Sequence, residues 1–232
     1  MNVLISGASK GIGRAIAIEM ANEGHNLALC ARNINELEIL KSQILATVPV
    51  KIFISACDCS VKEQVFEFTK TAQEELDKID VLVNNVGIFK PSFILDEEDE
   101  VFLSQLNTNL LSAYYFYKII GKTMRDATSG HIFNICSVAS VETLPHAGSY
   151  CVTKAGLLSL NNIMREELKS YGVKVTAILP GATYTHSWEE EGGNPQHFVQ
   201  PQDVAKAISS ALQMSAHAYT EQIIIKSLLV KS

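Results

Sequence analysis

The stretch that decides the fold is SGASKGIG, residues 6–13, which lies between a short apolar run and a segment of helical periodicity. Its glycines, Gly7, Gly11 and Gly13, follow the spacing G-x-x-x-G-x-G. A tight turn there needs backbone angles that glycine adopts freely, and a close approach to a pyrophosphate leaves no room for a Cβ atom. The amides at the start of the following helix then face the phosphates. The stretch therefore predicts the strand, loop and helix that open a dinucleotide-binding sheet.

Outward from this stretch, apolar runs of a strand's length alternate with longer segments of helical periodicity. The runs are rich in Val, Ile and Leu without alternation, which is typical of parallel strands buried on both faces. Seven strands are predicted, at residues 2–6, 26–31, 51–56, 81–84, 131–137, 174–179 and 222–226. Helices are predicted between them at about residues 13–22, 34–46, 61–76, 97–124, 150–171 and 201–214. This order predicts an α/β protein with a doubly wound Rossmann fold: a parallel sheet with helices on both faces and a crevice at the carboxyl ends of its strands.

Length and composition favour one domain. With 232 residues, 47% of them hydrophobic, the chain can bury a large core, and we expect residues 1–232 to form a single domain. The formal net charge of −6, with acids and bases interspersed, argues against nucleic acid or an anionic membrane surface as the main partner. No apolar run approaches the roughly 18 residues of a membrane-spanning helix, and the start, MNVLISGA, lacks the features of a signal peptide. A cytoplasmic protein is predicted.

The chain has five scattered cysteines, an odd and unpatterned set that fits a reducing compartment better than a disulfide framework. The sequence CDC at residues 57–59 raises the question of a metal site. No second pair of cysteines or histidines stands at ligand spacing, so the sequence predicts no bound metal.

The end of the second predicted strand indicates which nicotinamide cofactor the crevice accepts. A carboxylate there binds the ribose 2′-hydroxyl of NAD and repels the 2′-phosphate of NADP. Here the strand ends in LCARN, with Ala31 and Arg32 and no acid, and Lys10 of the glycine loop can add a second positive charge. We therefore predict NADP(H) as the cofactor. The alternative is that Arg32 and Lys10 are two ordinary solvated basic residues.

Three polar side chains stand at the end of the fifth predicted strand, in HIFNICSVASVETLPHAGSYCVTKAG, residues 131–156. Tyr150 and Lys154 are four residues apart and share one helix face, so the ammonium can sit near the phenol. A free tyrosine titrates near ~10 and is a poor acid–base catalyst at neutral pH, whereas a neighbouring cation favours the phenolate. Ser137 can hydrogen-bond the oxygen that gains charge when a hydride moves. Tyr-x-x-x-Lys alone occurs by chance on many helices, so whether these three residues form an active site must be judged from the other motifs of the chain.

Together, these motifs resemble the short-chain dehydrogenase/reductase family over nearly the whole chain. SGASKGIG resembles the cofactor loop of the family, Asp58 its adenine contact, and NNVG, residues 84–87, its fourth-strand motif. The residues that match the catalytic tetrad are Asn109, Ser137, Tyr150 and Lys154. PGATYT, residues 180–185, is similar to the loop after the sixth strand, with Thr185 as the expected contact of the nicotinamide amide. In this order and spacing the motifs are highly specific.

The resemblance implies hydride transfer between NADP(H) and a carbonyl/alcohol pair. It makes Tyr150 the acid–base, Ser137 the anchor of the reacting oxygen, and Lys154 the residue that binds the ribose and tunes Tyr150. Asn109 would hold a water that links Lys154 to solvent. The cofactor contacts that the resemblance implies are Gly7, Ser9, Lys10, Gly11, Ile12, Gly13, Arg32, Asp58, Asn85, Gly87, Tyr150, Lys154, Pro180, Gly181 and Thr185.

The chain departs from the family pattern at a few positions. Ser6 replaces the commoner threonine and Val86 the commoner alanine, small changes that we expect to preserve the turns. Cys136 and Cys151 flank catalytic candidates, and packing explains them better than a redox role. The C-terminus, EQIIIKSLLVKS, lacks the Gly-Gly ending of many members. A homodimer or homotetramer through the helices at 97–124 and 150–171 is still expected.

Residues 182–200, between the sixth strand and the last helix, are expected to form a substrate lid, as this segment does in the family. Tyr184, Trp188 and Phe198 either line the substrate site or merely pack the lid. Three acids at 189–191 would repel the acidic surface of an acyl carrier protein. YTHSW, residues 184–188, resembles sepiapterin-reductase-like members. A small free ketone or dicarbonyl is therefore the predicted substrate, with 3-oxoacyl-[acyl-carrier-protein] reductase as the alternative.

Two further functions compete with an NADPH-dependent carbonyl reductase. An NADP-sensing regulator on the same fold would be no enzyme and would not need the tetrad, yet all four members are present. An epimerase or dehydratase of the larger related family would have the glycine spacing G-x-x-G-x-x-G and a bigger C-terminal substrate domain. The glycine spacing and the short tail of this chain argue against that reading.

Overall fold

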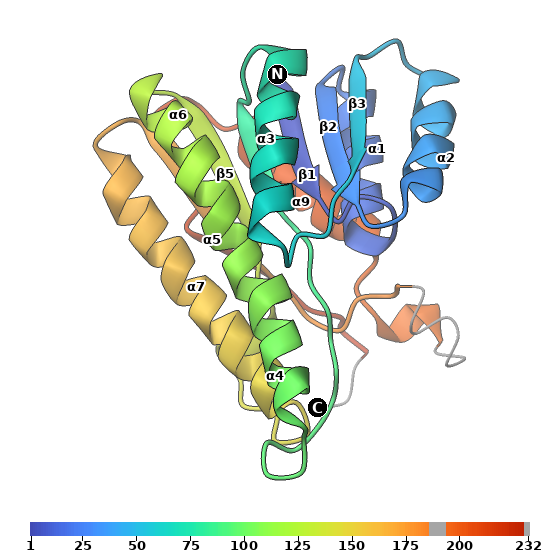
Figure 1. The fold of residues 1–232 in the computed structure, drawn as a ribbon, viewed down its shortest axis with the longest axis vertical. Helices are drawn as coiled ribbons and strands as arrows, with labels where there is room; N and C mark the ends of the chain where they lie inside the picture. The colour runs from blue at the N-terminus through green and yellow to red at the C-terminus, as the bar shows by residue number, and fades with distance from the viewer. Residues whose placement is uncertain (186–193, 230–232) are drawn as a thin grey trace.

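The computed structural model describes residues 1–185 and 194–229, which are organised around one parallel sheet (Figure 1). Seven strands lie in the order β3-β2-β1-β4-β5-β6-β7, and all neighbouring strands pair in parallel. The strands are β1 (Asn2–Ser6), β2 (Asn26–Ala31), β3 (Ile52–Ala56), β4 (Val81–Asn84), β5 (Gly130–Ile135), β6 (Val173–Pro180) and β7 (Gln222–Ile225). The predicted α/β class with a doubly wound parallel sheet is confirmed.

Helices cover both faces of the sheet (Figure 1). On one face lie α1 (Gly11–Asn22), α2 (Ile34–Leu45) and α9 (Pro201–Leu212). On the other lie α3 (Lys62–Leu76), the helical run α4 (Asp99–Leu106), η1 (Asn107–Leu111), α5 (Ser112–Phe116), η2 (Tyr117–Gly121) and α6 (Lys122–Asp126), and α7 (Gly148–Lys169). Two short 3₁₀ helices, η3 (Val138–Ser140) and η4 (Pro195–His197), lie in loops. Among the described residues, none of these helices has both the length and the apolar character that crossing a membrane requires.

Each face of the sheet has its own apolar core, which explains why the strands read as continuous apolar runs. Successive side chains of a strand point to opposite faces, so Ile5 of β1 packs in the core under α1, α2 and α9, while its neighbour Leu4 packs in the other. Ile208 of α9 belongs to the first core and Phe116 of α5 to the second, and all four side chains are fully buried. The side chains on both faces of the central strands are thereby buried away from water.

Three buried asparagines cross the sheet as a chain of side-chain amides. Asn84 at the end of β4 donates from Nδ2 to Oδ1 of Asn134 in β5 at 2.8 Å. Asn134 in turn donates to Oδ1 of Asn161 in α7 at 2.9 Å. Because an unpaired amide is costly in a dry core, this chain fixes the position of α7 against β4 and β5.

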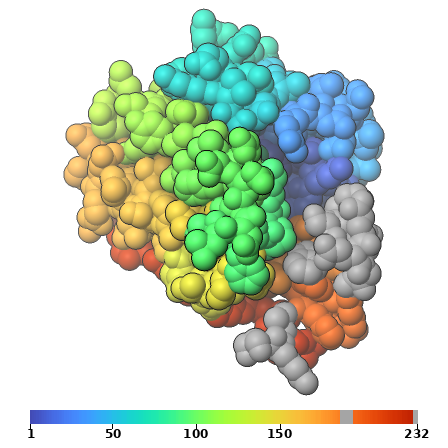
Figure 2. All heavy atoms as spheres, turned by 60° about the horizontal axis from the view of Figure 1, so that its bottom comes forward, coloured from blue at the N-terminus to red at the C-terminus, as the bar shows by residue number. Residues whose placement is uncertain are grey.

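The strand order reverses at β1, which pairs with β2 on one side and β4 on the other. In sheets of this kind the crevice for a ligand opens at such a switch point, beyond the carboxyl ends of the strands. That edge lies at the bottom of Figure 1 and is turned toward the viewer in Figure 2, where the green residues of α4 stand beside the blue N-terminal residues with a recess between them.

Two local features differ from the sequence-based expectations. The helix expected over 97–124 contains two π-helical segments, η1 and η2, and π turns of this kind occur often at functional sites. The expectation that the fifth strand extends to Ser137 is wrong, because β5 ends at Ile135. Ser137 leaves the strand ladder since its hydroxyl accepts a hydrogen bond from the amide of Ala139 and caps η3.

Candidate active site

The glycine loop between β1 and α1 has a geometry that only glycine tolerates. Gly7 and Gly11 have φ angles of +67° and +52°, in the left-handed region. A Cβ on Gly13 would lie 2.3 Å from the carbonyl oxygen of Gly7 and 2.5 Å from Nδ2 of Asn85. The first turn of α1 thus packs directly against the loop and leaves its free amides at the crevice, a cradle that fits a pyrophosphate.

Ser6 and Asn85 tie this loop to the end of β4. The amide nitrogen Nδ2 of Asn85 donates to the carbonyl oxygens of Ser6 and Gly7 at 2.9 and 3.0 Å. The Ser6 hydroxyl accepts from the backbone amides of Asn85 and Val86 at 3.0 and 3.1 Å. A serine hydroxyl is therefore sufficient for these contacts, and both turns stay fixed despite the departures at Ser6 and Val86.

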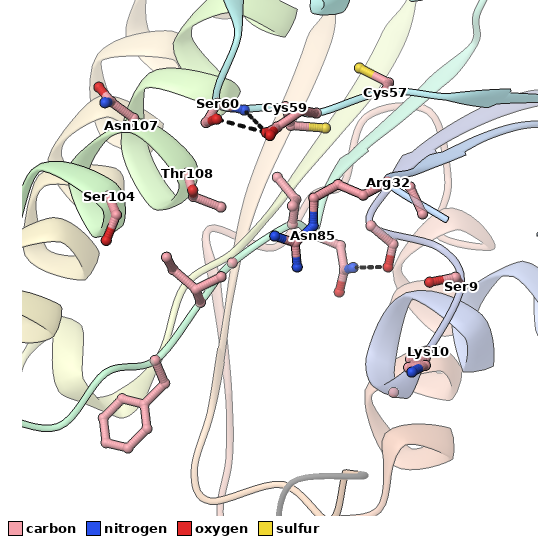
Figure 3. A pocket seen from close by; sticks show the side chains of 18 of the residues that line it. Ser9, Lys10, Arg32, Cys57, Cys59, Ser60, Asn85, Ser104, Asn107 and Thr108 are labelled. Atoms are coloured by element: carbon pink, nitrogen blue, oxygen red, sulfur yellow. Dashed lines mark hydrogen bonds between the residues drawn. The ribbon is translucent and has the colours of Figure 1, made fainter. Parts of the chain in front are cut away.

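A cavity of about 1080 Å³ runs from the glycine loop past the end of β4 to α4. Figure 3 shows Ser9, Lys10 and Arg32 on one side and Ser104, Asn107 and Thr108 on the other, with Asn85 between them. The predicted cofactor contacts that line it are Gly7, Ser9, Lys10, Gly11, Ile12, Arg32, Asp58, Asn85, Gly87 and Thr185. In the described part of the chain, five other predicted contacts do not belong to this lining: Gly13, Tyr150, Lys154, Pro180 and Gly181.

The charges at the end of β2 differ from those that the sequence suggested. Arg32 is exposed, but Lys10 forms an ion pair with Glu36 of α2, with Nζ 3.0 Å from Oε1. Hydrogen bonds from Lys10, Ser9 and Asn33 hold the pKa of Glu36 below its usual value. The sequence reading missed this acid, although Asn33 with Glu36 three residues later is the signature of a helix start, which places both at the cavity.

Asp58 lies in the segment that follows β3, on the cavity wall. Its Oδ1 accepts hydrogen bonds from the amide and the hydroxyl of Ser60 at 2.9 and 2.7 Å, and its own amide donates to Gln64 at 2.7 Å. The neighbouring Cys57 and Cys59 also belong to the wall. Hydrogen bonds from Cys30 and Cys59 lower the pKa of the Cys57 thiol to about 4.

Lys154 and Tyr150 lie together at the start of α7. The Lys154 side chain is buried, and its Nζ donates to the carbonyl oxygen of Ile135, the last residue of β5, at 2.8 Å. The same Nζ lies 5.8 Å from the centroid of the Tyr150 ring. A Cβ on Gly87 would be 3.4 Å from both Nζ of Lys154 and Oδ1 of Asn109. The structure therefore brings Asn109, Tyr150 and Lys154 together beside Gly87.

Asn109 lies in the π segment η1 and joins two parts of the site. Its Oδ1 accepts from the amide of Ile88 at 2.7 Å, while its Nδ2 donates to the carbonyl of Ile88 at 2.9 Å and to Oγ1 of Thr153 at 3.1 Å. The Asn109 side chain thus satisfies both the backbone N–H and the backbone C=O of Ile88, as a neighbouring strand does in a sheet. Through its bond to Thr153, it also fixes the segment after β4 to α7, next to Lys154.

Ser137 is placed by the cap that it forms. Its hydroxyl accepts from the amide of Ala139 at 3.1 Å, and its own amide donates to the Ser140 hydroxyl at 3.2 Å. Neither of these bonds uses the hydroxyl hydrogen, which can therefore be donated to another oxygen. Ser137 follows Ile135 by two residues, so it stands near the carbonyl that holds Lys154.

Phe89, which the sequence reading missed, packs edge-on against Tyr150, with ring centroids 4.9 Å apart and planes at 84°. The segment that carries it, residues 88–98, docks on the start of α7. Glu97 accepts hydrogen bonds from the hydroxyls of Ser92 and Ser149, and Ser92 forms a β-bridge with Ala147. No local motif marks Phe89, because its role depends on this docking.

The predicted lid is described only in part. Tyr184 and Phe198 pack with ring centroids 5.9 Å apart, and the amide of Tyr184 donates to the carbonyl of Val199 at 2.8 Å. Thr185 approaches the glycine loop, since a Cβ on Gly11 would lie 3.1 Å from its Cγ2. Trp188 lies outside the described residues.

The comparisons with known proteins agree with this architecture. A model of the family described as short chain dehydrogenase matches residues 1–195. Sepiapterin reductase of Chlorobaculum tepidum is 32% identical over 232 residues, covering 97% of this chain and 95% of that protein. The residues matched by the family model include the glycine loop and the four tetrad positions.

Solved structures give the same result. An alcohol dehydrogenase from the archaeon Thermococcus sibiricus, complexed with 5-hydroxy-NADP, superposes with a TM-score of 0.93 at 27% identity, covering 100% of this chain and 98% of that one. A levodione reductase superposes with a TM-score of 0.89 at 25% identity, covering 97% and 96%. The glycine loop, the parallel sheet and these matches together establish that the chain belongs to the short-chain dehydrogenase family of oxidoreductases.

Proposed function

We propose that this protein is an NADPH-dependent reductase of small ketones and dicarbonyl compounds, with a secondary alcohol as the substrate in reverse. One observation carries the proposal: the buried Lys154 ammonium stands 5.8 Å from the centroid of the Tyr150 ring and lies beside Gly87, which is a residue of the cavity wall. A phenol with a fixed cation next to a nucleotide-sized cavity is an arrangement suited to proton transfer that accompanies hydride transfer.

The residues that would hold the cofactor follow the cavity. The amides of the glycine loop would bind the pyrophosphate, Arg32 the 2′-phosphate, and Asp58 the adenine end. Gly87, Thr185 and the turn of Pro180 and Gly181 would enclose the nicotinamide end. Bound NADPH supplies the hydride, which leaves the proton to the protein. The 5-hydroxy-NADP bound in the Thermococcus sibiricus structure supports this choice of cofactor.

Tyr150 donates its hydroxyl proton to the carbonyl oxygen of the substrate. The charge of Lys154 stabilises the phenolate that remains, and the hydrogen bond to Ile135 holds this ammonium in place. Ser137 donates its free hydroxyl hydrogen to the same carbonyl oxygen, while the bond from the Ala139 amide holds its Oγ in place. Asn109, across Gly87 from Lys154, would hold a water through which the proton of Tyr150 is replaced. Because both hydrogens of its Nδ2 are donated to Ile88 and Thr153, this water would bind to an oxygen of Asn109.

The aromatic surroundings of Tyr150 favour a compact, flat substrate. Phe89 stands edge-on to the Tyr150 ring and adds an apolar surface beside it. Residues 182–200 would close over the substrate, with the packed pair of Tyr184 and Phe198 as part of its wall. The similarity to a sepiapterin reductase supports a planar dicarbonyl or a pteridine side chain as the substrate class.

A screen of NADPH oxidation tests the proposal. Diketones, aldehydes, pteridines, steroids and short β-ketoacyl thioesters, free and attached to an acyl carrier protein, are offered side by side. We expect the fastest turnover with a free small dicarbonyl. A preference for the carrier-bound thioester would overturn the substrate class, and tight NADPH binding without turnover of any carbonyl would overturn the assignment as a reductase.

A further inference from the structure

Three cysteines from separate parts of the sequence meet under the wall of the cavity. Cys30 lies in β2, and Cys57 and Cys59 follow β3. Their three Sγ atoms lie within 4.8 Å of one another, and those of Cys30 and Cys59 are 3.8 Å apart. All three thiols are buried in the core that also contains Val65 and Phe68 of α3. The cluster is therefore separate from the catalytic residues at the start of α7.

Strand pairing explains how the cluster forms. In the register of β2 with β3, Cys30 stands opposite Ser55, and the amide of Cys57 donates to the carbonyl of Ala31 at 2.9 Å, continuing the ladder. Residues two apart on a strand share a face, so Cys57 lies on the same side as Ser55 and Cys30. The turn at Asp58 then brings Cys59 back to that side.

The spacing of the sulfur atoms suits a single soft cation. Thiolate sulfurs bind zinc at ~2.3 Å, which places three of them about 4 Å from one another around one ion. The Sγ atoms of Cys30 and Cys59 already have this spacing at 3.8 Å, and all three atoms lie within 4.8 Å, so small side-chain rotations close the site. The cluster offers no oxygen ligand, which disfavours magnesium and calcium, whereas sulfur ligands select zinc and its heavier relatives.

We propose that Cys30, Cys57 and Cys59 form a binding site for one thiophilic divalent cation of the zinc group. Binding forms three metal–sulfur bonds and releases the thiol protons to solvent, with no change of oxidation state. The sequence reading expected no metal because Cys57 and Cys59 had no visible partner. Cys30 supplies the third ligand through the pairing of β2 with β3.

The position of the site gives it a consequence for ligand binding. Cys57 and Cys59 flank Asp58, and all three belong to the cavity wall, as Figure 3 shows for the two cysteines along one edge of the pocket. An ion on both cysteines fixes the turn that presents Asp58, and by reciprocity a nucleotide bound against that turn changes the affinity for the ion. This consequence rests on the proposed function, whereas binding of the ion itself does not.

Cadmium titration of the reduced, metal-free protein tests the site. Cadmium bound to thiolates absorbs in the ultraviolet by charge transfer, and a phosphine reductant keeps the cysteines reduced without competing as a thiol. We expect the absorption to saturate at one cadmium per chain and zinc to displace it. Zinc should also raise the melting temperature, because it binds the folded state.

Single substitutions identify the ligands. Cys57→Ser and Cys59→Ser should each weaken cadmium binding at least tenfold, and Cys30→Ala serves as the third variant because alanine fits a buried position. Cys151→Ser is the matched control, since Cys151 is a free thiol outside the cluster. Circular dichroism confirms that each variant is folded. The proposal is overturned if the wild type shows no saturable absorption, or if the folded Cys57→Ser and Cys59→Ser variants bind cadmium as tightly as Cys151→Ser does.

Discussion

The two ends of the candidate active site hold their positive charges in opposite ways. At the end of β2, the side chain of Lys10 is 57% exposed and Arg32 is exposed as well. At the start of α7, Lys154 is only 4% exposed and bonded to a backbone carbonyl. Exposed charges are screened by salt and held loosely, whereas buried polar groups are fixed before a ligand arrives. We call the start of α7 the fixed end and the end of β2 the exposed end. The fixed end suits proton transfer, whereas the exposed end suits discrimination between NADPH and NADH through small differences in binding free energy.

The largest effect is expected at the fixed end. Tyr150→Phe should leave folding and NADPH binding intact and lower kcat by about 1000-fold, because the proton donor is lost. Steady-state reduction of the best dicarbonyl measures the change. Tyr171→Phe is the control, since Tyr171 is exposed and lies beyond the far end of α7. Substantial turnover by the Tyr150 variant would show that the buried end does not supply the proton.

A change in the loop between the two ends should come next. In Gly13→Ala, the new Cβ would meet the carbonyl of Gly7 at 2.3 Å, so the loop must shift. The displacement of the loop that relieves this contact should weaken NADPH binding about 100-fold. Gly24→Ala is the control, because no atom lies within 4 Å of its Cβ position, and its φ of +79° should reduce stability but not NADPH affinity. Fluorescence titration with NADPH measures both, and equal affinities would argue that the loop does not touch the cofactor.

At the exposed end, Arg32→Ala should lower kcat/KM for NADPH about tenfold and leave NADH unchanged, because a 2′-phosphate loses one cation. The loss should shrink at high ionic strength, since an exposed charge is screened. Measuring both cofactors at two salt concentrations tests this. Arg125→Ala, in a residue of α6 that pairs with Asp126, is the control. If the loss in kcat/KM for NADPH did not depend on salt, Arg32 would be held as firmly as Lys154 and would not be a screened surface charge.

The smallest effect is expected at Glu36. Glu36→Gln removes the partner of Lys10, so kcat/KM for NADPH should rise about threefold relative to NADH, in line with the small energy of an exposed ion pair. Glu38→Gln, on the exposed side of the same helix, provides the control. A fall in NADPH preference would mean that Glu36 positions Lys10 for the phosphate rather than competing with it.

Local patterns were sufficient for most of the fold. The apolar runs and the glycine loop predicted the strands and helices, because burial on both faces leaves a continuous signal in the sequence. The end of β5 was misplaced by two residues, since the cap at Ser137 depends on a hydrogen bond to Ala139 that no propensity encodes. The π segment at Asn109 likewise has no mark in the sequence.

What the sequence could not supply in the site was contact between distant segments. Cys30 meets Cys57 only through the register of β2 with β3. Phe89 reaches Tyr150 because Glu97 docks its segment on α7. Glu36 was within reach of local reasoning through the capping signature with Asn33, but its ion pair with Lys10 joins two elements. Motifs therefore located the tetrad, and tertiary pairing determined its neighbours.

The chain of buried amides from Asn84 through Asn134 to Asn161 has a consequence for how the protein opens. Withdrawing α7 from the sheet would break the bond between Asn134 and Asn161 and leave Nδ2 of Asn134 without this partner, so partial detachment of this helix is penalised. Backbone amides of α7 should then exchange with deuterium only when β4 and β5 also open, as one cooperative unit. The segment at 88–98 is bonded to Asn109 of η1 and to Ser149 of α7 through contacts nearer the surface, and it should exchange through smaller openings. Tyr150 would thus belong to the part of the molecule that unfolds last, whereas its aromatic neighbour Phe89 belongs to a segment that unfolds early.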